Sequence, residues 1–348
     1  MPSFTVSPRL ERAVDTLVNK SFAIQDGEGV LLTADTRTDS ALLDAVARGV
    51  IRAGGRPTIA ISPLLPFQGG LSDPYVPDHL KAAMAASDVW LDFCFPYHAG
   101  SGAHSDAMAG KRVRYLLLAM PSLESFERLF GALDWEPMIE FNVAFSEYVQ
   151  ASVGKQVRFT CPLGTDVRFT LAEMKVPRRR VNDKPGMYTV PGTQSFYPVK
   201  DSVRGTLMLS ALFDEYYRGL AKPVRIEAEG NIVRFSGGGA EDRPSFERAL
   251  NRANNMKGYG GFVHFTYGFH PGTMLTNRYF IEDIRVPGSN AIGMGLPWWE
   301  PGGGENHPDG IVFDQSLWIG DELVAEGGSF VGPAHLKRLH DAMKRRLD

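Results

Sequence analysis

The stretch Gly29-Val-Leu-Leu-Thr-Ala-Asp35 decides the fold class of the first half of the chain. It is a short apolar run that ends in turn residues, which is typical of a buried β-strand. Thr38-Asp-Ser40 then supplies an N-cap, and Ala41–Arg52 carries apolar residues at helical spacing until Gly54 and Gly55 end the helix. A strand followed directly by a helix predicts the repeating unit of a parallel sheet.

The same alternation continues outward from this stretch. A helix is predicted from Pro77 to Ala86, and further buried strands are predicted at Pro57–Ser62, Val89–Phe95 and Val113–Ala119. We therefore expect residues 1–154 to form an α/β domain, a parallel sheet with helices on both faces. No Gly-x-Gly-x-x-Gly motif follows the first strand, so the sequence does not predict a nucleotide cofactor.

After Lys155 the pattern changes to period two. Gln156–Cys161 and Asp166–Leu171 alternate apolar and polar residues around Pro162-Leu-Gly-Thr165, which predicts a hairpin. One helix is expected from Pro244 to Met256. Six further strands complete the pattern, at 223–228, 232–235, 261–268, 277–284, 310–313 and 316–319. Residues 155–348 are therefore predicted to be a second domain, mainly antiparallel and β-rich.

Composition excludes several classes of protein. The 348 residues are 43% hydrophobic and 22% charged with a formal net charge of −3, ordinary values for a globular chain. No run of Lys and Arg is long enough to follow a phosphate backbone, so nucleic acid is not an expected partner. The two cysteines, Cys94 and Cys161, favour a reducing compartment, and no apolar stretch approaches the roughly 18 residues of a membrane span. A cytoplasmic protein is expected.

Asn306-His-Pro-Asp309 is the strongest chemical signal. In an extended segment residues i and i+2 share a face, so His307 and Asp309 can bind one ion together. His264, from a separate predicted strand, would complete two imidazoles and one carboxylate on one side of a metal. That set leaves open positions and is the arrangement in which non-haem Fe(II) binds substrate and O2. The alternative is a hydrogen-bonded polar cluster without a metal.

Other residues are candidates for the rest of an active site. His98 follows a predicted strand at its C-terminal end, where α/β sheets bind ligands, and His270 lies in a turn beyond His264. Proton transfer in an active site needs a base and an acid, and histidine suits both roles. Trp298 and Trp299 predict an aromatic wall or lid, or else a pinned surface loop or a subunit contact.

The remaining candidates complete the predicted site. The predicted catalytic residues are His98, His270 and Tyr267, and the predicted substrate-binding residues are Gln194, Tyr197, Trp298, Trp299 and Glu305. Three carboxylates, Glu282, Asp283 and Glu300, are candidates to orient a ligand imidazole.

Several motifs in order resemble the aminopeptidase T group of metallopeptidases. These are Gly164-Thr-Asp166, Pro191-Gly-Thr-Gln194, Asp201–Leu207, Gly261–Gly272 and His307-Pro-Asp309. The resemblance implies an N-terminal α/β domain and a C-terminal β-rich metal domain. The group's dinuclear enzymes have glutamates where this chain has Gln194 and His264, and two metals need bridging anionic ligands.

Tyr259–Gly268 followed by His307-Pro-Asp309 is more similar to 2,5-dihydroxypyridine 5,6-dioxygenase, an Fe(II) enzyme family with the same fold. This resemblance implies that His264, His307 and Asp309 hold the iron, and that His98 matches a histidine that reaches toward the substrate. It also implies homo-oligomers. The chain departs from the family at Lys184–Val190, where a glutamate and two histidines are replaced.

Three functions follow from these observations. The leading one is a mononuclear Fe(II) dioxygenase that opens the ring of a dihydroxypyridine or a related hydroxylated aromatic, with O2 as co-substrate. The second is a Zn or Mn metallohydrolase, a peptidase or amidase, which the fold alone favours. The third is a non-catalytic binding protein. Fold does not determine function, and the intact set of three ligands places the dioxygenase first.

Overall fold

The computed structural model describes residues 7–173, 179–296 and 306–344, and the chain in it forms two compact units. The first unit contains the chain up to Glu136 together with Arg179–Val190, and the second contains most of the rest from Pro137 onward. Residues 137–154 thus group with the second unit, and residues 179–190 group with the first. Helix α6 (Trp135–Gln150) packs Phe141 and Phe145 edge-on against Phe269 and Phe330, so nearly all of it belongs to the second unit.

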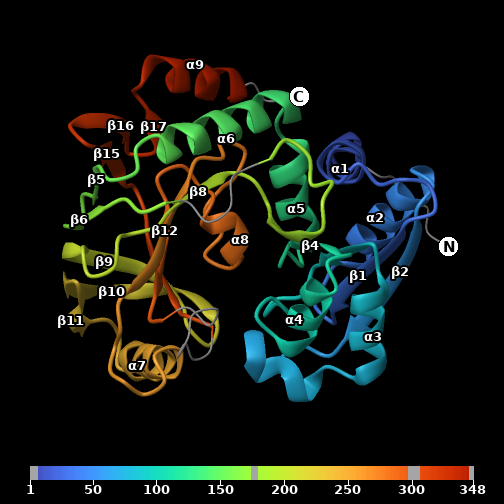
Figure 1. Cartoon of the computed structure of the whole chain (residues 1–348), viewed down its shortest axis with the longest axis horizontal. Helices are drawn as coiled ribbons and strands as arrows, with labels where there is room; N and C mark the ends of the chain where they lie inside the picture. Colours follow the sequence, from blue (N-terminus) through green and yellow to red (C-terminus); the bar gives the residue numbers. More distant parts are fainter. Residues whose placement is uncertain (1–6, 174–178, 297–305, 345–348) are drawn as a thin grey trace. The chain divides into compact units, whose positions relative to one another are not determined.

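The first unit is the expected α/β structure (Figure 1). Its sheet has five parallel strands in the order β2-β1-β3-β4-β7, with helices packed around it. Its elements are α1 (Pro8–Asp15), η1 (Thr16–Ser21), β1 (Gly29–Asp35), α2 (Ser40–Arg52), β2 (Arg56–Ser62), η2 (Gly69–Tyr75), α3 (Asp78–Ala86), β3 (Val89–Asp92), α4 (Gly102–Ala109), β4 (Arg114–Leu117), α5 (Leu123–Phe126), η3 (Glu127–Gly131) and β7 (Gly186–Thr189).

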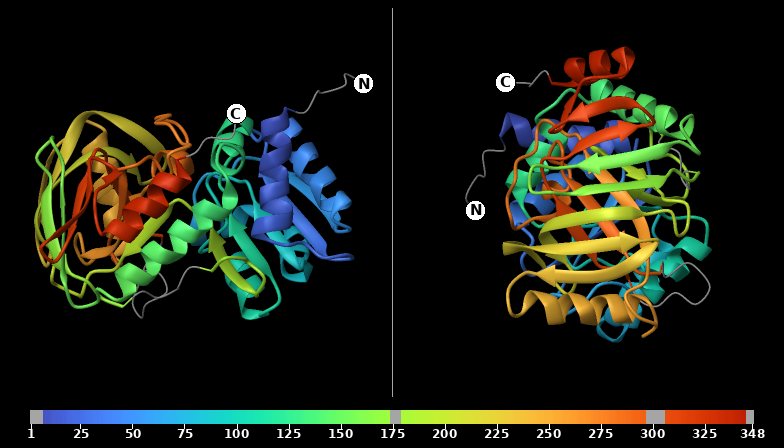
Figure 2. Two further views of the ribbon diagram at one scale, coloured as in Figure 1. Left: turned by 90° about the horizontal axis from the view of Figure 1, so that it is seen from above. Right: turned by 90° about the vertical axis from the view of Figure 1, so that its left-hand side faces the viewer.

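The second unit is built on a large curled antiparallel sheet (Figure 2). Within the described ranges its strands run in the order β17-β16-β15-β5-β6-β9-β14-β13-β12-β8, with β10 and β11 branching from β9. Its elements after α6 are β5 (Gln156–Thr160), β6 (Asp166–Thr170), β8 (Thr193–Phe196), β9 (Arg204–Phe213), β10 (Tyr217–Glu229), β11 (Asn231–Gly237), α7 (Asp242–Ala253), β12 (Phe262–Gly268), α8 (Phe280–Asp283), β13 (Asn290–Met294), β14 (Asp309–Val312), β15 (Ser316–Ile319), β16 (Glu322–Glu326), β17 (Ser329–Phe330) and α9 (Ala334–Met343).

An aromatic cluster fills one face of this sheet. The rings of Phe159, Phe169, Phe196 and Phe265 have centroids 4.5–6.3 Å apart in the pairs that contact one another, and all four side chains are buried. Buried aromatic side chains contribute the most apolar area per residue to a core. The period-two pattern of β5, β6 and β12 thus serves packing on this face and leaves the other face for polar residues.

One predicted strand is wrong. Residues 277–284 form a turn and the short helix α8, because polar side chains satisfy the backbone locally. The Thr276 hydroxyl accepts hydrogen bonds from the backbone N–H groups of Arg278 and Tyr279, and the Asp283 carboxylate accepts from the backbone and hydroxyl of Thr276. Such side-chain bonds stabilise turns in competition with strand pairing.

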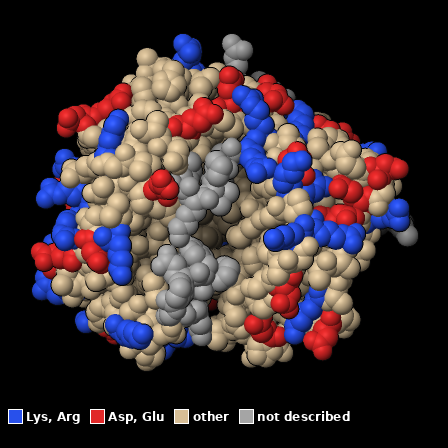
Figure 3. All heavy atoms as spheres, in the orientation of Figure 1, with Lys and Arg blue, Asp and Glu red and all other residues tan. Residues whose placement is uncertain are grey.

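The charged surface and the apolar character of the helices bear on two classes of protein, nucleic-acid-binding and membrane-spanning proteins. On the face that Figure 3 shows, Lys and Arg side chains are interleaved with Asp and Glu side chains. None of the helices in the described ranges combines the length and the apolar composition needed to cross a bilayer. The absence of a nucleic-acid partner remains a prediction.

Candidate metal centre

Three neighbouring strands of the second unit place His264, Gly293 and Asp309 in one row. In the antiparallel register Gly293 of β13 is the partner of His264 on β12 and also of Asp309 on β14. Side chains that are level on adjacent strands point to the same face of a sheet. Because the residue between them is glycine, the histidine and the aspartate can approach one another across β13. His307 lies two residues before Asp309 along the chain and joins the same group.

The ligand atoms lie at distances that suit one ion. Nε2 of His264 is 3.0 Å from Nε2 of His307 and 3.6 Å from Oδ1 of Asp309, and the three side chains form one candidate metal group. Ligands about 2.1 Å from an ion are about 3.0 Å apart on an octahedral edge and about 3.4 Å apart on a tetrahedral edge. The residues therefore fit a bound metal, and both geometries are compatible with the spacing.

Electrostatics gives a second reason to place a cation here. Burial raises the pKa of Asp309 to about 8, and its Oδ1 accepts no hydrogen bond among the described residues. Burial lowers the pKa of His264 to about 4; burial and then the neighbouring His264 lower the pKa of His307 to about 3. These pKa shifts favour the uncharged form of all three side chains. A divalent cation would restore the charged carboxylate and accept both imidazole lone pairs.

Two further residues of the centre were not predicted. A Cβ atom at Gly293 would lie 2.6 Å from Nε2 of His264 and 2.8 Å from Cδ2 of His307, so only glycine fits between the imidazoles. On the other side of the ring, Nδ1 of His264 lies 3.0 Å from the Thr266 hydroxyl. Strand register reveals the first residue and strand period the second. Thr266 lies inside the Tyr259–Gly268 motif, but the motif does not mark it as a site residue.

His98 belongs to a different polar cluster, in the first unit. Its Nδ1 is 3.0 Å from Oδ1 of Asp92, and its Nε2 is buried with no hydrogen-bond partner among the described residues. Asp92 also accepts hydrogen bonds from the hydroxyls of Thr33 and Tyr115 and from the backbone N–H of His98. Asp92, Cys94 and His98 are spaced closely enough for a metal. However, burial raises the pKa of Cys94, which keeps the thiol protonated, and the Asp92 oxygens already have donors.

The structure places the other predicted residues away from this face or gives them structural contacts. Tyr267 and Gln194 are register partners on β12 and β8, one residue out of phase with His264 and Thr266, so they point to the opposite face. Tyr267 is buried there and donates to the backbone oxygen of Gln315 at 3.0 Å. His270 Nδ1 accepts from the backbone N–H of Gly272.

The remaining predicted residues that the structure describes have hydrogen bonds with other parts of the second unit. The Tyr197 carbonyl, just after β8, accepts a hydrogen bond from the backbone N–H of Ala172. Asp283 bonds to Thr276 and Tyr217, and Glu282 accepts from the backbone N–H of Met274, so neither is the group at Nδ1 of His264. Four of the predicted residues lie outside the described ranges: Trp298, Trp299, Glu300 and Glu305.

Comparison with known proteins decides the family. The sequence profile of 2,5-dihydroxypyridine 5,6-dioxygenase matches residues 19–290. The chain belongs to this family. The matched region includes strand β12 with His264 and ends before His307 and Asp309. In the structure these two residues lie next to His264. No curated protein sequence matches the chain.

Two solved structures share the fold. The chain is similar to 2,5-dihydroxypyridine dioxygenase from Pseudomonas putida KT2440, with a TM-score of 0.72 and 16% identity over 94% of this chain and 98% of that one. It is also similar to wild-type AmpT from Thermus thermophilus, with a TM-score of 0.63 and 13% identity over 93% of this chain and 99% of that one. At these identities the likeness establishes the fold, and the family establishes a dioxygenase-like protein.

Proposed function

We propose that the chain is a mononuclear non-haem Fe(II) dioxygenase that opens the ring of a dihydroxypyridine or a related hydroxylated heteroaromatic. The observation that carries the proposal is the group His264, His307 and Asp309, which supplies two imidazoles and one carboxylate on one face of the curled sheet. This donor set is typical of Fe(II) oxygenases that keep positions free for substrate and O2. Membership of the dioxygenase family supports the same reaction.

The three proposed ligands differ in the charge that they contribute to the centre. His264 and His307 are neutral donors, since burial holds the pKa of each imidazole well below 7. Asp309 contributes the single negative charge of the set, so a divalent ion keeps a net positive charge at the centre. Bound iron would supply the redox chemistry and the open positions for the substrate oxygen and O2. The remaining positive charge favours a substrate that binds through a deprotonated hydroxyl.

A catalytic role for His98 remains a prediction from the sequence, and within the first unit the surroundings of His98 suit proton transfer. Asp92 holds Nδ1 of His98 at 3.0 Å, which fixes the ring and leaves Nε2 as the nitrogen that can take a proton. Burial opposes the charge of Asp92, but the contacts with His98 and the hydrogen bond from the Thr33 hydroxyl together outweigh burial and hold the pKa of Asp92 below its ordinary value. A buried carboxylate–imidazole pair of this kind stabilises the protonated ring after transfer.

The alternative function is a metallohydrolase of the aminopeptidase T kind, using Zn or Mn. The shared fold with AmpT favours it. Two metals 3.5–4 Å apart need bridging anionic ligands, and the metal group in the described part of the second unit contains one carboxylate, Asp309. His264 and Gln194 stand where the resemblance expects glutamates. The donor set thus favours one ion, and with it the dioxygenase.

One experiment separates the two functions. Protein prepared without oxygen is loaded with Fe(II), Zn(II) or Mn(II), and O2 uptake is measured against a panel of hydroxypyridines while peptide hydrolysis is measured in parallel. We expect O2 uptake that requires both iron and a dihydroxylated ring, and its loss in His307→Ala. Peptide turnover with Zn or Mn, without O2 uptake on any ring, would establish the hydrolase instead. A cytoplasmic location and a homo-oligomer remain predictions.

A further inference from the structure

Two hydroxyl groups continue from the metal ligand His264 to the edge of the curled sheet. Oγ1 of Thr266 lies 3.0 Å from Nδ1 of His264 and 3.0 Å from Oγ of Ser195. None of the sequence motifs includes Thr266 or Ser195 as a site residue, and neither is a ligand. The three side chains form an unbroken chain of hydrogen bonds that starts on the ring nitrogen remote from the metal group.

Strand geometry brings these residues together. Thr266 follows His264 by two positions on β12, so both side chains point to the same face. Ser195 of β8 is the direct register partner of Thr266, and partners on adjacent antiparallel strands share a face. Thr266 is 9% exposed, so its hydroxyl depends on protein partners more than on solvent.

The chain of hydroxyls has one consistent direction when a metal is bound. A neutral imidazole that gives its Nε2 lone pair to a metal carries its proton on Nδ1, and that proton needs an acceptor. The Thr266 oxygen can accept it, and the Thr266 hydroxyl can then donate to Ser195. The backbone carbonyl of Ala291, partner of Thr266 on β13, is a second acceptor for the His264 ring.

We propose that Thr266, supported by Ser195, is a positioning residue that holds His264 as the Nδ1–H tautomer with Nε2 directed at the metal. The inference rests on the proposed metal function and adds to it the group that orients a ligand. A hydroxyl fixes the tautomer without adding negative charge beside the ion, unlike a carboxylate. This agrees with the positive centre inferred for binding a deprotonated substrate hydroxyl.

The test measures metal affinity and does not depend on turnover. Anaerobic titrations with Fe(II) and Co(II) compare wild type with Thr266→Val, which replaces the hydroxyl by a methyl group of similar size, and with Thr266→Ser, which keeps the hydroxyl. Thr170→Val, an exposed threonine on β6 of the same sheet, is the matched control. The visible spectrum of bound Co(II) reports ligand geometry, and the melting temperature of the metal-free protein reports folding.

We expect Thr266→Val to lower the affinity for both metals by about 10–100-fold and to change the Co(II) spectrum. Thr266→Ser should restore affinity and spectrum, and Thr170→Val should change neither. Wild-type affinity and spectrum in a folded Thr266→Val would overturn the inference and leave the metal function standing. A wild-type protein that binds neither metal would overturn the proposed function itself.

A second variant covers the case in which Thr266→Val does not fold. Ser195→Ala removes the far hydroxyl and leaves Thr266 in place, on a half-buried position that tolerates a smaller side chain. Lower Fe(II) and Co(II) affinity in folded Ser195→Ala supports the chain of hydroxyls. Unchanged affinity in that variant, when Thr266→Val cannot be measured, counts against it.

Discussion

Nε2 of His264 lies 3.6 Å from Oδ1 of Asp309, although strand β13 separates the strands that carry these residues. The approach is made across Gly293, the shared register partner of both. A side chain at this position would fill the space between the imidazoles. The approach of His264 and Asp309 therefore depends on Gly293 between them, because glycine has no side chain.

Metal affinity should depend on pH through one proton. The pKa of Asp309 is raised to about 8, while those of His264 and His307 are lowered to about 4 and about 3, so from about pH 5 upward only Asp309 binds a proton that the metal must displace. We expect the apparent Kd for Fe(II) to fall about tenfold per pH unit up to about pH 8 and then to level. Anaerobic titrations from pH 5.5 to 9 check this.

Asp309→Asn is the control for this pH dependence. The amide cannot lose a proton, so the variant should bind Fe(II) weakly and with little change between pH 6 and 8. A steep profile that persists in Asp309→Asn would assign the proton to another group. A flat profile in the wild type would show that Asp309 is already ionised before the metal binds.

Gly293→Ala should abolish the centre while leaving the strand formed. The new Cβ would lie 2.6 Å from Nε2 of His264, and pairing of β13 on both sides prevents the backbone from moving away. We expect Fe(II) affinity to fall at least about tenfold and unfolding free energy to fall by about 1–3 kcal/mol from overpacking. Gly70→Ala, where a Cβ meets no atom within 4 Å, should change neither quantity. Unaltered metal binding in Gly293→Ala would contradict the described site.

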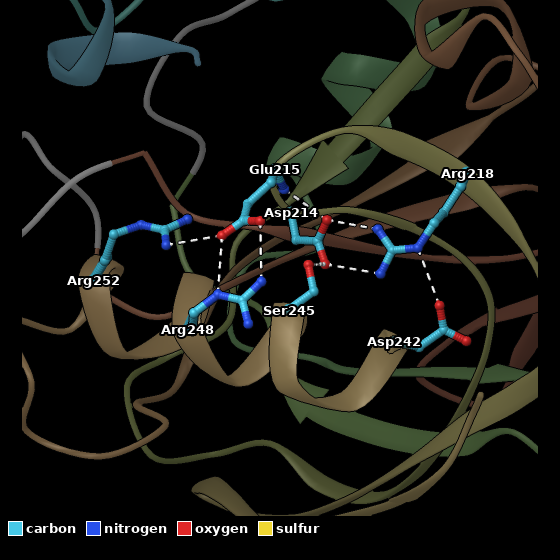
Figure 4. Close-up of polar contacts among 7 residues, drawn as sticks. All are labelled: Asp214, Glu215, Arg218, Asp242, Ser245, Arg248 and Arg252. Carbon is cyan, nitrogen blue, oxygen red and sulfur yellow. Dashed lines mark hydrogen bonds and ion pairs between the residues drawn. The ribbon is translucent and has the colours of Figure 1, made fainter. Parts of the chain in front are cut away.

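An ion-pair network centred on the buried Asp214 lies just after the end of β9 (Figure 4). Asp214 follows Phe213, the register partner of Asp309. The Asp214 carboxylate accepts hydrogen bonds from the Arg218 guanidinium at 2.7 and 3.1 Å and from the Ser245 hydroxyl at 2.8 Å. Burial opposes the charge of Asp214, but Arg218 and the hydrogen bonds from Glu215 and Ser245 together outweigh burial, and the pKa of Asp214 lies below its ordinary value. Arg218→Met would leave this carboxylate without its cation, and we expect a loss of about 3–5 kcal/mol at neutral pH.

The loss in Arg218→Met should depend on pH in a definite direction. A carboxylate with a depressed pKa contributes stability above its ordinary pKa, and that contribution is lost as the pH falls through the folded-state value. The stability gap between wild type and Arg218→Met should therefore narrow as the pH falls toward about 3, in denaturant unfolding. Arg234→Met, which breaks an exposed pair with Glu227, should cost much less stability than Arg218→Met, because solvent screens an exposed pair. Equal losses in the two variants would contradict the assigned roles.

The sequence predicted those strands and helices whose formation depends on their own local residues. Strand β1 has the predicted bounds because it is a continuous apolar run between turn residues, and the β5–β6 hairpin follows its period-two pattern. Extended spacing and the family motif both point to His264, His307 and Asp309, whose ligand atoms lie close together in the structure, and their role as metal ligands stays a prediction. Parallel pairing in the first unit and antiparallel pairing in the second are confirmed.

Features that depend on tertiary contacts could not be predicted this way. Strand β13 reads Asn-Ala-Ile-Gly-Met, with too little β-branched or alternating character to mark a strand, yet it forms the middle of the centre. The importance of Gly293 and Thr266 follows from register, which no local pattern specifies. Likewise α6 joins the second unit through ring contacts of Phe141 and Phe145 with residues far along the chain.

The most direct test of the central claim is the identity and position of the ion in anaerobically prepared protein. Anomalous scattering at the iron edge, together with elemental analysis, should show one iron per chain, about 2.0–2.3 Å from Nε2 of His264, Nε2 of His307 and a carboxylate oxygen of Asp309. Two ions at this position, or a single ion bound to other residues, would contradict the proposed mononuclear Fe(II) centre.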